Sequence, residues 1–115
     1  MDDIEIARYY ISKYINAKTK GIEFTLSFNE FKRIVTRQTC YYTRIPFNKD
    51  VPALFRTLDR IDNTKGYEKG NVVACLHCVN NIKSFIENTN NPLTLTSFRD
   101  VLTLSINHIN KSKEK

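Results

Sequence analysis

The sequence predicts an α+β fold in which a small strand–loop–strand–helix core is flanked by helices from both termini. Two short apolar runs, at residues 58–61 and 72–73, are separated by a loop rich in turn-forming residues. An apolar stripe with helical spacing follows directly, over about residues 76–86. With 115 residues we expect one domain with a modest core. Its parts are a helical N-terminal part at about 1–38, the core at about 55–86 and a C-terminal helix at about 96–110.

The N-terminal part carries two helical patterns. The first predicts an amphipathic helix over about 3–18, ended by Lys20 and Gly21. Ser27 and Glu30 form a capping-box pattern, which predicts a second helix over about 28–37. Residues 39–42 form a short, aromatic stretch, so we expect an extended segment. Its tyrosines, Tyr41 and Tyr42, are expected to lie in the core, although one of them could instead stack on a base or sugar.

The core follows after an irregular loop that is bracketed by Pro46 and Pro52. Leu58 and Ile61 belong to the first predicted strand, residues 63–66 turn the chain, and Val72 and Val73 form the second strand. The helical stripe then begins at about residue 76. A last helix over about 96–110 is predicted to be capped by Thr96 or Ser97.

Charge and hydropathy limit the possible partners. The net charge is +6, and residues 1–11 contribute −2, so the remainder of the chain carries +8. A basic body of this kind favours a polyanion, most economically nucleic acid, over a merely soluble basic surface. No apolar run approaches the ~20 residues of a membrane helix, so no membrane partner is expected. The N-terminus is acidic where a secretory signal would be basic, which predicts a cytoplasmic protein.

Three cysteines, Cys40, Cys75 and Cys78, raise the question of structural zinc. An odd number argues against a disulfide framework. A tetrahedral zinc site usually needs two pairs of ligands, and Thr43 stands where a second cysteine would complete the pair begun by Cys40. His77 is the remaining ligand type, but its position next to Cys78 would strain the chelate. Zinc is therefore not expected.

Acidic and amide side chains at the junction of the predicted strands and helix suggest metal chemistry. Hydrolysis of a phosphodiester with one metal needs oxygen ligands, a general base and cations that stabilise the transition state. Asp59 and Asn80 could supply oxygens to Mg²⁺ or Mn²⁺. Lys83 lies one helical turn beyond Asn80, so it could meet a phosphate, or be only a solvated lysine. Asp59 and Asp62 could equally cap turns or pair with Arg60.

The chain resembles the HNH nuclease family, whose core has a ββα-metal fold. The resemblance rests on residues 40–42, 58–67 and 71–73, with Asn80 and Lys83, and it covers about residues 39–86. It implies a metal-dependent endonuclease that acts on double-stranded DNA. Phosphate contacts are expected from basic residues of the core. Asn63 and Asn71 are of a type that often forms loops, and we expect Asn71 to close the loop by side-chain hydrogen bonds and not to contact metal. The basic residues are Arg60, Lys65, Lys69 and Lys83.

Two departures from the family pattern affect the predicted activity. Counted from Asn71, the family's zinc cysteines would fall at Leu76 and Val79, so we expect apolar packing in place of zinc. The family's catalytic histidine would follow Asp59, where this chain has Arg60. A guanidinium stays protonated and cannot act as a general base. Asp62, His77 or the phosphate itself must then assist the attacking water, or the site does not cut.

Three hypotheses follow. The protein is a small metal-dependent HNH-type endonuclease, a catalytically inactive relative that binds DNA, or an inhibitor or regulator whose former DNA face binds a host protein. If the chain is phage-encoded, its compartment is the host cytoplasm. Fold alone does not decide among them.

Overall fold

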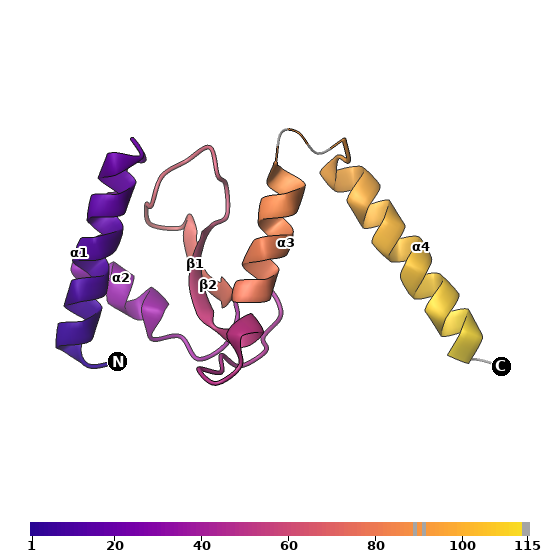
Figure 1. Ribbon diagram of the computed structural model, residues 1–115, viewed down its shortest axis with the longest axis horizontal. Coiled ribbons are helices and arrows are strands. Elements are labelled where there is room, and N and C mark those ends of the chain that lie inside the picture. Colours follow the sequence, from indigo (N-terminus) through magenta and orange to yellow (C-terminus); the bar gives the residue numbers. More distant parts are fainter. Residues whose placement is uncertain (89, 91, 114–115) are drawn as a thin grey trace. The chain divides into compact units, whose positions relative to one another are not determined.

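The computed structural model describes residues 1–88, 90 and 92–113. The observed elements match the predicted order of helix, helix, strand, strand, helix, helix (Figure 1). They are α1 (Asp3–Thr19), α2 (Phe28–Val35), the short 3₁₀ helix η1 (Pro52–Leu54), β1 (Arg56–Arg60), β2 (Val72–Leu76), α3 (His77–Glu87) and α4 (Leu95–Lys113). The prediction of a mixed helical fold with a small two-stranded antiparallel sheet is confirmed. By internal contacts the chain divides into two compact units, Met1–Asn80 and Asn81–Lys115.

Both N-terminal helices begin where their capping residues allow. The Asp2 carboxylate accepts a hydrogen bond of 2.8 Å from the backbone N–H of Glu5 at the start of α1. The predicted capping box is present at α2: Ser27 accepts from the Glu30 N–H and Glu30 accepts from the Ser27 N–H. α1 ends at Thr19, and Gly21 follows at φ +70°, a conformation that glycine adopts at low cost. These local interactions are all visible as sequence patterns.

The main core lies between α1, α2 and the sheet. Six buried side chains form it: Ile6, Leu26, Phe31, Val35, Leu58 and Val72. Tyr10 extends this cluster, since its ring makes edge-to-face contacts with three phenylalanines and its hydroxyl donates to the Leu26 carbonyl at 2.7 Å. Fully burying one large apolar side chain contributes about 1.5–3 kcal/mol. This packing fixes the sheet against the N-terminal helices.

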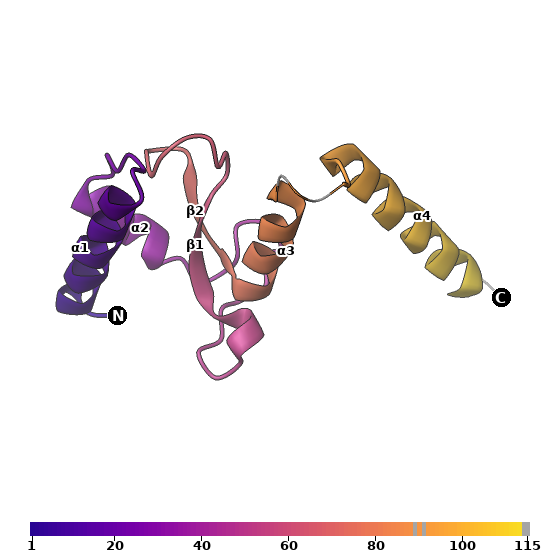
Figure 2. The ribbon, with the colours of Figure 1, turned by 45° about the horizontal axis from the view of Figure 1, so that its top comes forward.

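The sheet is a hairpin with a long loop. Arg56 pairs with Leu76 and Arg60 with Val72, so Asp59 lies opposite Val73. The loop between the strands docks on the connection between α1 and α2, as Figure 2 shows. Tyr67 donates to the Glu23 carbonyl at 2.8 Å, and its own carbonyl accepts from Thr25 at 3.0 Å. A Cβ atom at Gly66 would lie 2.4 Å from the Glu23 carbonyl oxygen, so this approach requires glycine.

The segment after α2 differs from the prediction. Thr39 forms an isolated bridge with Pro46, and the chain then turns at residues 41–43 instead of remaining extended. The Tyr41 N–H donates to the Ala74 carbonyl at 2.9 Å, which fastens this turn to the outer edge of β2. Tyr41 and Tyr42 are 50% and 39% exposed, so the expectation that both lie in the core was wrong. In a strand, successive side chains alternate between the two faces, whereas in this turn both tyrosine side chains are partly exposed to solvent.

The C-terminal helix begins earlier than expected. The Thr94 hydroxyl accepts a hydrogen bond of 3.0 Å from the Ser97 N–H, so Thr94 and neither Thr96 nor Ser97 caps α4. The prediction missed this because three hydroxyl residues fall within four positions, and only the backbone geometry distinguishes them. Within the described ranges, none of the helices is sufficiently long and apolar to span a bilayer.

Candidate functional site

Asp59 is the most constrained acidic residue of the core. It lies in β1 and is only 6% exposed. Its Oδ2 accepts a hydrogen bond of 2.5 Å from the Tyr42 hydroxyl. A buried carboxylate is costly unless its oxygens are hydrogen-bonded, so Tyr42 supports the placement of this charge. Asp59, the predicted metal ligand, is thus held by a hydrogen bond in a position that is largely closed to water.

Asn71 organises the loop beside Asp59. Its side-chain oxygen accepts from the Asp62 N–H at 2.9 Å, and its amide nitrogen donates to the carbonyls of Asp62 at 3.0 Å and Gly66 at 2.9 Å. The residue is 6% exposed, so these bonds satisfy an otherwise buried amide. Asn71 therefore closes the loop through its side-chain hydrogen bonds, as predicted from the sequence. Asn63 participates through its backbone carbonyl, which accepts from Arg60 at 3.2 Å.

Arg60 is also engaged within the loop. Its Nη1 donates to the Lys65 carbonyl at 2.9 Å as well as to Asn63, and its guanidinium lies 5.4 Å from the centre of the Tyr67 ring. Two carbonyl acceptors and an aromatic face suit a permanently charged planar fork. Arg60 therefore stabilises the loop between β1 and β2 through these contacts.

Asp62 caps a turn. Its Oδ1 accepts from the Thr64 hydroxyl at 2.6 Å and the Thr64 N–H at 2.9 Å. These two hydrogen bonds hold the pKa of Asp62 below its ordinary value. A carboxylate stabilised in its ionised form is a weaker base, so this geometry disfavours Asp62 as the group that deprotonates water.

His77 and Asn80 belong to the start of α3, which follows β2 without a gap. The backbone N–H of His77, an exposed residue, donates to the Phe55 carbonyl at 2.9 Å. Phe55 precedes Asp59 by four residues on the same stretch of chain, which corresponds to roughly 13 Å along a strand. The structure therefore places His77 toward the opposite end of the hairpin from Asp62, and the two do not converge on one point.

The cysteines anchor the first turn of α3. Cys40 and Cys75 are fully buried with Leu76, and Phe47, Leu54, Cys78 and Val79 pack against them. Cys40 Sγ accepts from the Leu76 N–H at 3.5 Å. None of the three cysteines forms a disulfide. These side chains pack together as an apolar cluster beneath the start of α3, the helix that carries Asn80.

The predicted phosphate-binding lysines lie in different surroundings. Lys65 and Lys69 are exposed on the loop between β1 and β2. Lys83, on α3, pairs with Glu87 at 3.4 Å across one helical turn. The loop lysines are thus presented to solvent beside the Asp59 region, whereas a phosphate at Lys83 would compete with a carboxylate.

The ligand types predicted for the metal, a carboxylate at Asp59 and a side-chain amide at Asn80, suit a hard cation that keeps much of its water. One carboxylate and one amide oxygen, from Asp59 and Asn80, are compatible with Mg²⁺ or Mn²⁺ bound partly through substrate phosphate. Among residues 1–88, 90 and 92–113, no group of three or more histidine, cysteine or acidic side chains could hold a metal ion by itself. A site here would thus need oxygen atoms from water and substrate.

This arrangement of strands, loop and helix is found in a nuclease of known structure. The chain superposes on PacI, described as a rare-cutting HNH restriction endonuclease that perturbs DNA, with a TM-score of 0.54. The match covers 95% of this chain and 81% of PacI, at 20% sequence identity. The fold is HNH-like.

Sequence relatives of this HNH-like chain occur in viruses. It is 36% identical over 69 residues to an uncharacterized 29.0 kDa protein from the dda–modA intergenic region of enterobacteria phage T4, covering 60% of this chain. It is 34% identical over 76 residues, 63% of this chain, to the uncharacterized protein R423 of Acanthamoeba polyphaga mimivirus. The match spans 28% of the phage protein and 13% of the mimivirus protein. No protein-family model matches the chain.

Sequence reasoning missed the role of Tyr42. The hydroxyl that satisfies Asp59 comes from 17 residues earlier in the chain, and no local periodicity links the two positions. The sequence pattern indicates core packing for Tyr41 and Tyr42, or stacking of one of them on a base or sugar, but no hydrogen bond to Asp59. The available indication was the presence of an acidic residue in a predicted strand, which required a hydrogen-bonding partner from elsewhere.

Proposed function

We propose that the protein binds double-stranded DNA through its HNH-like core and hydrolyses phosphodiester bonds slowly with Mg²⁺ or Mn²⁺. One observation carries the proposal: the chain shares the fold of an HNH restriction endonuclease over 95% of its length. The site adds chemical support, because a buried carboxylate at Asp59 lies in β1 beside a loop that presents Lys65 and Lys69. A net charge of +8 outside residues 1–11 favours the same partner.

Each residue has a distinct part in this proposal. Asp59 and Asn80 would hold the cation, which when bound would polarise the scissile phosphate and stabilise its developing charge. Tyr42 keeps the Asp59 carboxylate in place. Lys65 and Lys69 contact DNA phosphates, and Arg60 with Asn71 holds the loop that carries these lysines in position.

The proposal of slow cleavage follows from the base position. Arg60 cannot accept a proton, Asp62 is stabilised as a turn cap, and His77 lies toward the far end of the hairpin. General-base catalysis typically supplies about 10²–10⁴-fold in rate. Loss of a well-placed base therefore predicts binding without brisk cutting.

An inactive HNH-fold protein is the alternative that the engagement of Arg60 favours. Such a protein would bind DNA, or a host protein, as an inhibitor or regulator. The viral relatives support a viral origin, for which the host cytoplasm is the proposed compartment.

The first test is a nicking assay. Supercoiled plasmid is incubated with the protein and Mg²⁺ or Mn²⁺, with a chelator as one control and Asp59→Asn as the other. Asn keeps the shape of a buried side chain that Ala would leave as a cavity. Slow nicking that requires metal and disappears in Asp59→Asn is the expected result. Equal nicking by the variant would point to contamination.

The second test measures DNA affinity against salt. Duplex binding should weaken steeply, with a log–log slope of about −0.9 for each phosphate contacted. The double variant Lys65→Gln/Lys69→Gln should reduce the magnitude of that slope. A Lys18→Gln/Lys20→Gln protein, which removes the same charge from the end of α1, is the matched control. Absence of duplex binding at low salt would favour the protein-binding alternative.

A further inference from the structure

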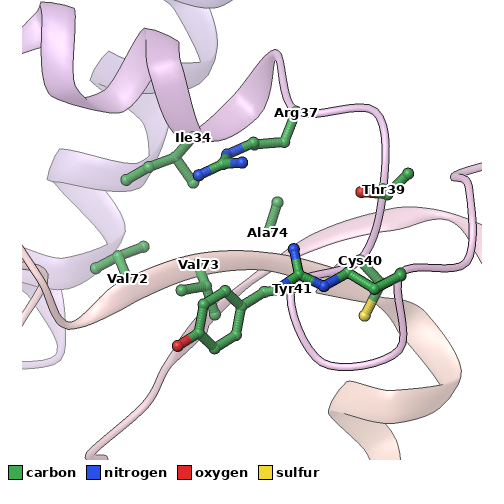
Figure 3. A pocket seen from close by; sticks show the side chains of 9 residues that line it. Ile34, Arg37, Thr39, Cys40, Tyr41, Val72, Val73 and Ala74 are labelled. Atoms are coloured by element: carbon green, nitrogen blue, oxygen red, sulfur yellow. The ribbon is translucent and has the colours of Figure 1, made fainter.

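A pocket of about 240 Å³ lies apart from the Asp59 side chain, between the C-terminal end of α2, the turn after it and the outer edge of β2. Figure 3 shows its walls: Arg37 extends from the end of α2, and the Tyr41 ring lies beside β2. The base of the pocket is apolar, formed by Ile34 and the buried residues Val72 and Ala74. It is therefore a small, partly apolar hollow with cationic walls.

The edge of β2 presents backbone groups to this pocket. The Ala74 carbonyl accepts from the Tyr41 N–H at 2.9 Å, so the backbone groups of Ala74 point away from β1. Alternate residues of a strand share this direction. Val72, two residues earlier and also lining the pocket, therefore turns its N–H and C=O the same way. The Ala74 carbonyl is taken by Tyr41, and the other backbone groups that point this way, the Ala74 N–H and the N–H and C=O of Val72, border the apolar surface.

Two arginines supply positive charge. Arg37 and Arg44 both line the pocket, and no acidic residue does. In the portion of the chain described here, neither arginine side chain forms an ion pair or a side-chain hydrogen bond. Arg44 is also the one non-glycine residue of that portion with a positive φ, +65°. A bulky residue is uncommon in this conformation, where asparagine or glycine would be less strained, so the position favours a role for the guanidinium.

We propose that this pocket binds one nucleotide unit, with its base against the Tyr41 ring and the β2 edge and its phosphate held by Arg37 and Arg44. Guanidinium groups recognise phosphate by paired hydrogen bonds. Bases stack on aromatic side chains, and backbone groups at the edge of a strand can bond to the edge of the base. A free phosphate would contact only the two arginines, and an apolar ligand would contact only the apolar floor of the pocket.

Two sources could supply this chemistry. One is a free nucleoside monophosphate. The other is an unpaired nucleotide in a DNA strand, and that source rests on the proposed DNA binding. Because the pocket lining does not include Asp59, Asn80 or the loop lysines, its occupancy can be measured separately from cleavage.

The first experiment titrates the protein by calorimetry with deoxynucleoside monophosphates, the matching deoxynucleosides and inorganic phosphate. At least tenfold tighter binding of a nucleotide than of either fragment is expected. Amide resonances of Val72 and Ala74 should shift on addition. Inorganic phosphate binding as tightly as every nucleotide would overturn the proposal, since the base would then contribute nothing.

Substitutions test the cations without disturbing the fold. Arg44→Asn removes the charge and places at φ +65° a residue that tolerates this conformation. Arg37→Gln removes the second charge. Each should weaken nucleotide binding at least tenfold without lowering the melting temperature. Lys20→Gln, an exposed cation at the end of α1, is the charge-matched control and should have no effect. Equal effects of all three would reject the pocket.

Duplexes with and without one unpaired nucleotide distinguish the sources. Preference for the bulged duplex that is lost in Arg44→Asn supports the strand nucleotide, whereas nucleotide binding without that preference supports the free ligand. Duplex binding with no nucleotide binding in any form would reject the pocket and leave the proposed function intact. Nucleotide binding with no duplex binding would support the pocket and reject the proposed DNA-binding function.

Discussion

The hydroxyl of Tyr42 donates a hydrogen bond of 2.5 Å to Oδ2 of Asp59, joining the turn after α2 to the first strand of the sheet. Asp59 is 6% exposed as a residue, whereas Tyr42 is 39% exposed. The buried Asp59 side chain is thus hydrogen-bonded to a tyrosine that is itself partly exposed to solvent. Together with the bond from the Tyr41 N–H to the Ala74 carbonyl, this bond holds the turn against the sheet.

Removing the Tyr42 hydroxyl should destabilise the fold. Tyr42→Phe leaves a nearly buried carboxylate with one donor fewer, so we expect the free energy of unfolding to fall by about 1–2 kcal/mol in urea denaturation. Tyr41→Phe, a neighbouring half-exposed tyrosine, is the control and should change it by less than about 0.5 kcal/mol. A double-mutant cycle with Asp59→Asn should return a coupling energy of about 1 kcal/mol. A coupling near zero would mean that the bond does not matter.

Substituting Arg60 should separate stability from cleavage. Arg60→His removes the two carbonyl contacts and the stacking on Tyr67, so the free energy of unfolding should fall by about 1–3 kcal/mol. If Asp59 and Asn80 hold a cation, the imidazole should raise metal-dependent nicking of plasmid. Arg60→Gln makes the same loss without an imidazole and should not gain activity. Brisk wild-type cleavage that falls in Arg60→His would instead assign Arg60 a direct role at the phosphate.

Asn71 should be among the most sensitive positions of the loop. Asn71→Ala deletes three hydrogen bonds and leaves the Asp62 N–H and two carbonyls without this partner. We expect a loss of roughly 2–4 kcal/mol in unfolding free energy. Asn29→Ala, at an exposed position of α2, should be within about 0.5 kcal/mol of wild type. Similar effects of the two substitutions would show that the loop does not depend on Asn71.

Acid should release the Asp62 turn. The pKa of this carboxyl is lowered in the folded protein, so its ionised form stabilises the fold at any pH above the unfolded value of about 3.9. That contribution is lost as pH falls through the lower, folded pKa. Asp62→Asn should therefore be less stable than wild type at pH 7, and the difference should shrink near pH 3. A difference in stability that stays constant across this pH range would show that the ionised Asp62 carboxylate does not stabilise the turn.

Zinc content is predicted to be low. Cys40 and Cys75 are buried in an apolar cluster, and Thr43 and Leu76 stand where further ligands would be needed. Metal analysis of protein purified without chelator should give well under one zinc per chain. Stoichiometric zinc that is lost in Cys40→Ser would contradict this prediction. Cys40→Ala should leave the measured zinc content unchanged and lower stability through lost packing and the lost bond from the Leu76 N–H.

Local features were determined by the sequence alone. The capping box at Ser27 and Glu30, the end of α1 near Gly21, and the two strands around an Asp–Asn-rich loop each arise from neighbouring residues. Their physical basis is short-range: a side chain satisfies a backbone group a few positions away, or an apolar residue recurs with the period of its element. This is why the order and type of the elements could be predicted.

Only the tertiary structure decided what surrounds the functional residues. The Tyr42 bond to Asp59 joins residues 17 apart. The approach of Gly66 to the Glu23 carbonyl depends on how the loop docks. The pocket formed by Arg37, Arg44 and the β2 edge exists because the segment after α2 turns instead of forming a strand. A sequence records which side chains need partners, but the choice of partner is made by long-range packing, because it depends on which distant backbone is brought within about 3 Å.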